Sequence, residues 1–162
     1  MSRLILTRCR LQAIIYSIAQ GAIDNASGVT SMIQMVLDNP ETLSNCLYVF
    51  AGNEELAYDY PIYWGYGYRQ FEKKYNNLIN DAKRVLVLDS FGHSEPLATN
   101  DPDLVYLGFP IKSFNENIKK IFMIHGDIDI LMSVYHSDLD GAHLIKEIYL
   151  KQAIKKALSL LK

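Results

Sequence analysis

The sequence predicts an all-α protein, an irregular bundle of about five to seven helices. Three observations lead to this prediction. Apolar residues recur at helical spacing along most of the chain, helix-capping residues precede several of these stretches, and Pro and Gly interrupt the pattern over a long irregular connection at about residues 89–112. A chain of 162 residues is long enough to bury a core. We therefore expect a single globular helical domain over residues 1–162.

Three helices are predicted in the first third of the chain. From about residue 4 to residue 23, apolar residues fall at helical spacings, which places them along one face. Ser27 or Thr30 caps a second helix that ends near Leu37. A third helix is predicted over residues 39–50, because its Asn-Pro-Glu start supplies a capping oxygen, a Pro suited to the first helical position and an acid near the positive end of the helix.

The rest of the chain predicts three or four more helices. The clearest amphipathic pattern runs over about residues 69–88. After the irregular connection, a capping box at residues 113–116 starts a helix that Gly126 ends. A short helix at about residues 128–135 leads to the last one, at about residues 139–161, which carries apolar residues on two opposite sides. One of these sides is expected to pack on the core, and the other on the same domain or on a second chain.

Composition and charge narrow the function classes. Hydrophobic residues make up 49% of the chain and charged residues 21%, which is ordinary for a folded globular protein. The formal net charge of −2 gives no overall attraction to nucleic acid or to an anionic membrane. No apolar run approaches the length of about 18 residues that a membrane span needs, and the apolar run near the start is too short for a signal peptide. Cys9 and Cys46 lie among apolar neighbours, as reduced core thiols of a cytoplasmic protein do.

Residues 58–68 form an unusual aromatic stretch that contains the only Trp of the chain. Three interpretations remain open: a part of the core, a protein-binding surface, or the wall of a small-molecule pocket. Tyr and Trp give a large contact area for little lost side-chain freedom, and the acidic residues nearby favour a basic partner surface. The residues expected to contact a partner are Glu54, Glu55, Asp59, Tyr63, Trp64, Tyr66 and Arg69.

A His-x-Asp-x-Asp pattern occurs twice, beginning at His125 and at His136. In one interpretation the Asp residues cap helices, because each pair lies where a predicted helix begins. In the other, imidazole and carboxylate groups hold a divalent metal ion, although no established zinc or calcium spacing is matched. The residues of this alternative metal site are His125, Asp127, His136 and Asp140.

These observations favour a non-catalytic cytoplasmic protein that acts by binding another protein, of the kind that includes bacterial immunity proteins and antitoxins. The prediction rests on elimination, since no catalytic constellation is evident, and it assigns no catalytic residue and no cofactor. Neither a membrane nor nucleic acid is expected as a partner, and a homodimer through the C-terminal helix remains open. The alternative is a small metal-assisted hydrolase that uses the His and Asp residues between His125 and His143.

Overall fold

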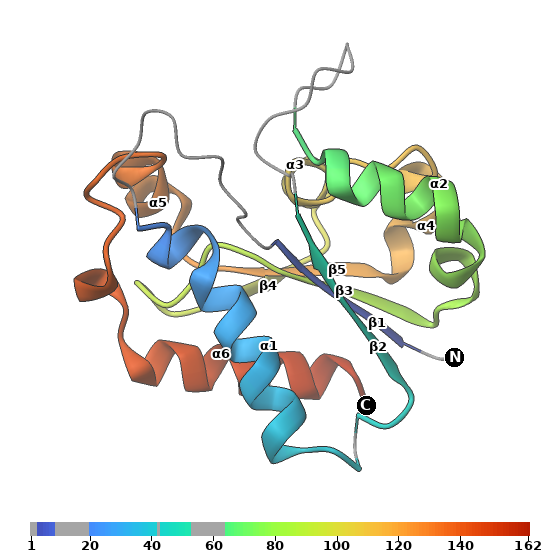
Figure 1. Ribbon diagram of the computed structural model, residues 1–162, viewed down its shortest axis with the longest axis horizontal. Helices are drawn as coiled ribbons and strands as arrows, with labels where there is room; N and C mark the ends of the chain where they lie inside the picture. The colour runs from blue at the N-terminus through green and yellow to red at the C-terminus, as the bar shows by residue number, and fades with distance from the viewer. Residues whose placement is uncertain (1–2, 9–19, 42, 53–63) are drawn as a thin grey trace.

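The protein folds around a five-stranded mixed sheet, with helices on both faces (Figure 1). The computed structural model describes residues 3–8, 20–41, 43–52 and 64–162. The spatial order of the strands is β2-β1-β3-β5-β4, in which β4 is antiparallel to β5 and the other pairs are parallel. The predicted all-α bundle is therefore wrong, and the chain has an α/β fold.

Each parallel strand is a short, nearly continuous apolar run. Such a run is typical of a strand that is buried on both faces of a sheet, because helices cover it above and below. Val85, Leu86 and Val87 in the middle of the sheet are all at most 1% exposed. The strands are β1 (Arg3–Arg8), β2 (Cys46–Ala51), β3 (Arg84–Leu88), β4 (Leu97–Thr99) and β5 (Ile121–His125).

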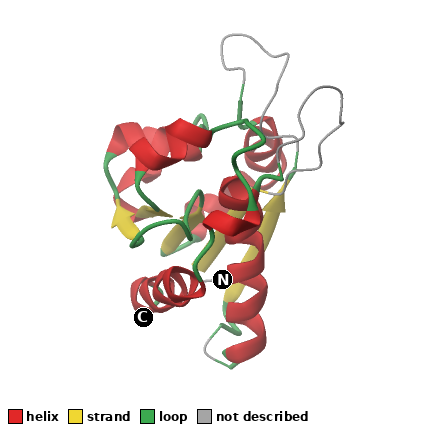
Figure 2. Cartoon of the chain, turned by 90° about the vertical axis from the view of Figure 1, so that its left-hand side faces the viewer, coloured by secondary structure: helices red, strands yellow, loops and turns green. Residues whose placement is uncertain are grey.

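The helices form two layers around this sheet (Figure 2). Helices α1 and α6 pack on one face through residues such as Met32 and Ala157, whereas α2, α3 and α4 cover the other through residues such as Tyr68 and Phe114. The helices are α1 (Ser27–Asp38), α2 (Tyr66–Asp81), α3 (Pro102–Gly108), α4 (Phe114–Asn117), α5 (Ile128–Val134) and α6 (Glu147–Leu160). Short helical turns occupy Ala22–Ala26, Ile118–Lys120 and Ala142–Leu144.

Four of the predicted helices contain a strand instead, because their apolar runs are too short and too continuous for a helix face. The helix predicted at residues 4–23 begins as β1, and its residues 9–19 lie outside the described part. The helix at residues 39–50 is a turn followed by β2, and the one at residues 69–88 divides into α2 and β3. The helix from the capping box ends after α4 and a helical turn, and the chain continues as β5.

Other predicted elements agree better with the structure. Helices α1 and α5 lie where the spacing predicts them, and Asp127 caps α5. The predicted cap of α1 is wrong, because Ala26 is its N-cap and Ser27 is already its first residue, and the last helix begins only at Glu147. The predicted irregular connection contains β4 and the seven-residue helix α3, whose Asp101 cap accepts hydrogen bonds from the backbone of Asp103 and Leu104. Within the described ranges, no helix combines the length and the apolar character that crossing a membrane requires. Cys46 is a free thiol, and Cys9 lies outside the described residues.

The strand order reverses between β1 and β3. From β1 the chain crosses to β2 on one side, then returns past β1 to β3 on the other. In open α/β sheets, the loops at the carboxyl ends of the strands separate at such a point and leave a crevice where ligands bind. The edge where β1 and β3 end is therefore the first place to look for a functional site.

Candidate functional site

Asn25 fastens the segment after β1 to the carboxyl ends of β1 and β3. Its Nδ2 donates hydrogen bonds to the Leu88 carbonyl at 2.8 Å and to Thr7 Oγ1 at 3.2 Å. Its Oδ1 accepts from the backbone N–H of Gly28 at 3.0 Å. Asn25 and Thr7 are both at most 3% exposed, so this network is shielded from water. The neighbouring residue Asp24, joined to Asn25 by a cis peptide bond, is thereby held at the strand-order reversal.

Asp24 faces an imidazole from a distant part of the chain. Its Oδ2 lies 3.8 Å from His136 Nε2, and Asp24 is 1% exposed. His136 follows α5 on a loop with a positive φ of 54°, and the Tyr135 ring stacks on the His136 ring with 3.7 Å between centroids. A buried carboxylate oxygen and an imidazole nitrogen thus point toward each other at the sheet edge. This pairing is suited to holding a proton or a cation between the two groups.

Asp140 holds the Asp24 segment from the other side. Its carboxylate accepts hydrogen bonds from the backbone N–H of Ile23 at 2.7 Å and of Asp24 at 3.2 Å, and Asp140 is 1% exposed. The Asp140 backbone carbonyl also accepts from the N–H of Ala22 at 3.4 Å. Because Asp140 belongs to the same loop as His136, these bonds fix the position of the His136 loop against Asp24.

A cavity of about 320 Å³ adjoins this pair. Asp89, the first residue after β3, lies in its wall, is 2% exposed, and accepts a hydrogen bond from Ser90 Oγ at 3.1 Å. Tyr135 connects the cavity to the Asp24–His136 pair, because its ring both lines the cavity and stacks on His136. The remaining lining residues are apolar or aromatic, apart from the backbone: Trp64, Leu104, Leu107, Gly108, Met123, Ile128, Leu131 and Met132.

The four residues of the sequence-predicted metal site do not come together as one group. His125 Nδ1 lies 2.6 Å from the Gly126 carbonyl oxygen, and Asp127 caps α5 by accepting from the Ile130 N–H at 3.0 Å. The structure instead brings His136 and Asp140 to the segment that contains Asp24. Among the residues that the structure describes, no three His, Cys, Asp or Glu side chains are grouped closely enough to hold a metal ion.

The predicted partner-binding residues fall partly outside the described structure, as Glu54, Glu55, Asp59 and Tyr63 do. Trp64 is half-buried in the cavity wall, and its Nε1 donates to the Leu107 carbonyl at 3.0 Å. Arg69 is buried and donates to the Trp64 carbonyl, while Tyr66 lies half-buried in the first turn of α2. The placement of Trp64 agrees with the pocket-wall interpretation of the aromatic stretch, and partner binding stays a prediction.

Sequence reasoning missed Asp24, Asn25 and Asp89. Residues 24–28 look like a polar break between two helices, and Asp89 looks like the start of a loop. The available signal is positional, since Asp89 directly follows an apolar run of β-branched and Leu residues. Polar residues directly after a buried parallel strand lie at the ligand-binding edge of an α/β sheet. The signal becomes visible only once the runs are assigned as strands.

No protein-family profile matches the sequence, and no curated protein matches it either. Solved structures do share its fold. A Zn-dependent exopeptidase from Parabacteroides distasonis superposes with a TM-score of 0.71 at 15% identity, over 99% of this chain and 73% of that one. A glutaminyl cyclase from Porphyromonas gingivalis gives 0.68 at 15% identity, over 99% and 71%, and one from an Acidobacteriales bacterium gives 0.60 at 14%, over 98% and 68%.

These similarities correct the functional prediction. The neighbours are α/β enzymes, so the prediction of a non-catalytic immunity or antitoxin-type protein is wrong, together with its all-α character. The elimination considered local motifs alone, whereas the candidate site brings together residues far apart in sequence. At 14–15% identity the likeness shows the fold alone. The fold agrees better with the hydrolase that the sequence offered as the alternative.

Proposed function

We propose that the protein is a metal-assisted hydrolase that removes an apolar residue from the end of a peptide. The observation that carries this proposal is the buried Asp24 carboxylate facing the His136 imidazole beside an apolar cavity, at the strand-order reversal. The likeness to a Zn-dependent exopeptidase and to glutaminyl cyclases supports it, because these proteins carry their chemistry on the same fold. The exopeptidase is described as Zn-dependent, so its metal and its type of reaction are the ones that we propose here.

The donor chemistry of the pair is right for zinc, which is bound in proteins by imidazole nitrogen and carboxylate oxygen. Catalytic zinc sites usually have three protein ligands, and the described residues supply only Asp24 and His136 in mutual contact. A third protein ligand is therefore not assigned among the described residues.

Each residue of the site has a distinct role in this proposal. Asp24 and His136 would hold the metal ion. The Asp140 carboxylate fixes this segment by accepting hydrogen bonds from the backbone N–H groups of Ile23 and Asp24. When bound, the ion would supply Lewis acidity toward the substrate carbonyl. Tyr135 and Trp64 would enclose the terminal side chain of the substrate and exclude water from it. The apolar lining favours aliphatic or aromatic side chains over charged ones.

Metal analysis together with peptide cleavage tests the proposal. Purified protein is expected to hold stoichiometric zinc and to release apolar terminal residues from fluorogenic substrates, with aminoacyl substrates testing the amino end and N-blocked peptides testing the carboxyl end. Asp24→Asn and His136→Ala should lower both zinc content and activity by about 100-fold or more, because outer partners of a metal site alone account for 10- to 100-fold. Glu95→Gln, which changes an exposed acid, is the matched control.

Two outcomes would contradict this function. If the folded protein contains no zinc as purified and binds none after incubation with the metal, the metal-assisted reaction is ruled out. A zinc protein that cyclises N-terminal glutaminyl peptides and leaves aminoacyl substrates intact would replace hydrolysis by the cyclase reaction. We also propose a cytoplasmic location, which the free thiol of Cys46 supports, and cell fractionation tests it.

A further inference from the structure

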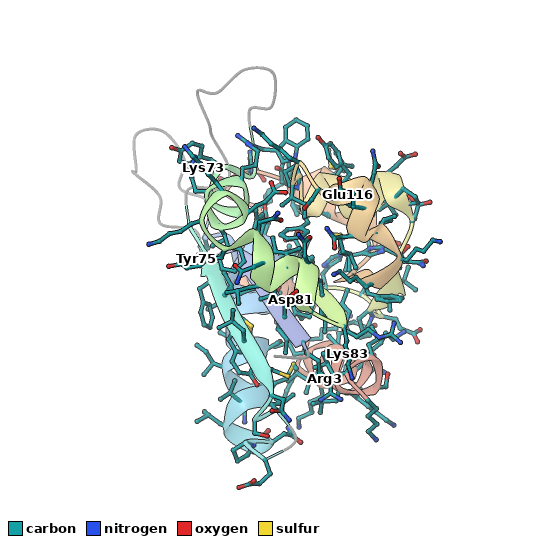
Figure 3. The ribbon with its side chains drawn as sticks, turned by 90° about the vertical axis from the view of Figure 1, so that its right-hand side faces the viewer. Arg3, Lys73, Tyr75, Asp81, Lys83 and Glu116 are labelled. Atoms are coloured by element: carbon teal, nitrogen blue, oxygen red, sulfur yellow. The ribbon has the colours of Figure 1, made fainter. Side chains whose placement is uncertain are left out.

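A second cavity, of about 510 Å³, lies at the opposite edge of the sheet, where the parallel strands begin. Apart from the buried Leu161, every residue that lines it carries a positive charge. These residues come from the starts of β1 and β3, the turn before β5, and the chain after α6: Arg3, Lys83, Arg84, Lys119, Lys120 and Lys162. Figure 3 shows Arg3 and Lys83 close together at this edge.

Two of these cations are placed side by side by the sheet itself. Arg3 of β1 and Arg84 of β3 are partners in the parallel register, so their side chains leave the same face of adjacent strands. The guanidinium of Arg84 lies over the Phe122 ring, with 5.0 Å from its central carbon to the ring centroid. Like charges at facing positions repel each other, and an anion between them would relieve this repulsion.

The cations of this cavity have few acidic partners. Among the described residues, no salt bridge joins a residue that lines the cavity to a carboxylate, whereas His136 pairs with Asp24 and Lys151 with Glu147 elsewhere. Burial lowers the pKa of Lys120, and the Asp81 carboxylate raises it by a smaller amount. Lys120 Nζ donates to the Asn80 carbonyl at 2.7 Å. In a chain whose formal net charge is −2, this edge is a local concentration of positive charge in a concave surface.

We infer that this cavity is a binding site for a small molecule that carries at least two phosphate charges. Arg supports such recognition because its planar guanidinium matches two phosphate oxygens at once, and Arg3 and Arg84 present two such groups together. The four lysines around them add point charges that neutralise the remaining oxygens. The site lies at the amino ends of the strands, away from the Asp24–His136 pair, and does not depend on the proposed hydrolase function.

Titration with inorganic pyrophosphate tests the inference. In two-dimensional amide spectra at low ionic strength, we expect pyrophosphate to shift the resonances of residues 3–5, 83–85, 119–121 and 160–162. Arg84→Gln should weaken binding by about tenfold or more, since one charge-assisted contact is lost. Lys73→Gln, which removes an exposed charge from α2, should leave the affinity unchanged. Asp24→Asn should also leave it unchanged, which separates this inference from the proposed function.

Three results would overturn the inference. The first is a titration in which pyrophosphate reaches saturating concentration and the amide resonances of this edge do not shift. The second is equal weakening by Arg84→Gln and Lys73→Gln, which would indicate diffuse attraction rather than a site. The third is binding of citrate as tight as that of pyrophosphate, which would mean that phosphate is not recognised. Because the contacts are electrostatic, the affinity should also fall as ionic strength rises from about 0.01 M to about 0.1 M, where the screening length shortens from about 30 Å to about 10 Å.

Discussion

The two edges of the central sheet carry opposite charges and are built differently. At the carboxyl edge, Asp24, Asp89 and Asp140 are all at most 2% exposed, and backbone or side-chain groups of the protein surround them. At the amino edge, Lys83 and Arg84 are exposed and extend into a concave surface. Buried polar groups are costly unless their hydrogen bonds are made, whereas exposed charges cost little. Substitutions at the carboxyl edge should therefore affect folding, and those at the amino edge should affect binding alone.

The largest effect is expected for Gly28→Ala. A Cβ at this position would lie 2.5 Å from Asn25 Oδ1, 2.5 Å from Thr7 Oγ1 and 2.7 Å from the Leu88 carbonyl oxygen. These atoms form the network that fastens the Asp24 segment, so the added methyl group should lower the free energy of unfolding by more than about 3 kcal/mol. Urea denaturation measures the change. Gln34→Ala on the exposed side of α1 is the control, and equal stability of the two variants would contradict the packing argument.

A smaller loss of stability is expected for Asp140→Ala. It leaves the N–H groups of Ile23 and Asp24 buried without their acceptor, which should cost about 2 kcal/mol. Asp140→Asn keeps one carbonyl oxygen and should recover part of this loss. In the proposed enzyme, zinc affinity should fall by about 10- to 100-fold in the Ala variant and recover partly in the Asn variant. Full zinc affinity in Asp140→Ala would show that Asp140 does not position the site.

Alkaline pH is expected to destabilise the protein moderately through the start of β2. Burial raises the pKa of the Cys46 thiol above its ordinary 9.0, and burial together with the neighbouring Cys46 raises that of Tyr48 to about 12. Both groups hold their protons more tightly in the folded state than in the unfolded state. Their contribution to stability is therefore complete below pH 9 and is lost as the pH rises from there toward 12. Urea denaturation across this window should show a shallower fall for Cys46→Ser.

The smallest effect on stability is expected at the amino edge. Arg84→Gln should change the free energy of unfolding by less than about 0.5 kcal/mol, because substitutions on the surface usually stay within this range. Thermal denaturation of this variant beside Gly28→Ala compares the two edges directly. A large loss for Arg84→Gln would show that its contact with the Phe122 ring stabilises the fold more than its exposure indicates.

The sequence predicted the individual helices better than the architecture. The apolar spacing after Ser27 and the cap at Asp127 are local signals, and α1 and α5 lie where these signals place them, although Ala26 and not Ser27 is the N-cap of α1. Runs such as Val85 to Leu88 fit a helix face or a buried strand equally well by their apolar character alone. Sheet formation decides between these states, and it depends on pairing with residues distant in sequence.

The candidate site was predictable only in fragments. His136 and Asp140 were singled out by their spacing, but their partner Asp24 lay in a segment that resembled a helix break. The lack of an established zinc or calcium spacing also counted against the His/Asp pattern. The actual pairing needs the sheet, because the Asp24 segment is placed by Asn25 at the ends of β1 and β3.

The contact between Asp140 and Ile23 joins residues 117 positions apart. During synthesis, a ribosome therefore completes all five strands of the sheet before it adds Asp140, the acceptor for the Ile23 and Asp24 amides. Strand β1 pairs with both β2 and β3, so it has neighbours on both sides only after β3 has been synthesised. The nascent chain should thus remain incompletely folded and exposed to chaperones until Asp140 emerges, since contacts between distant residues form late and slow folding.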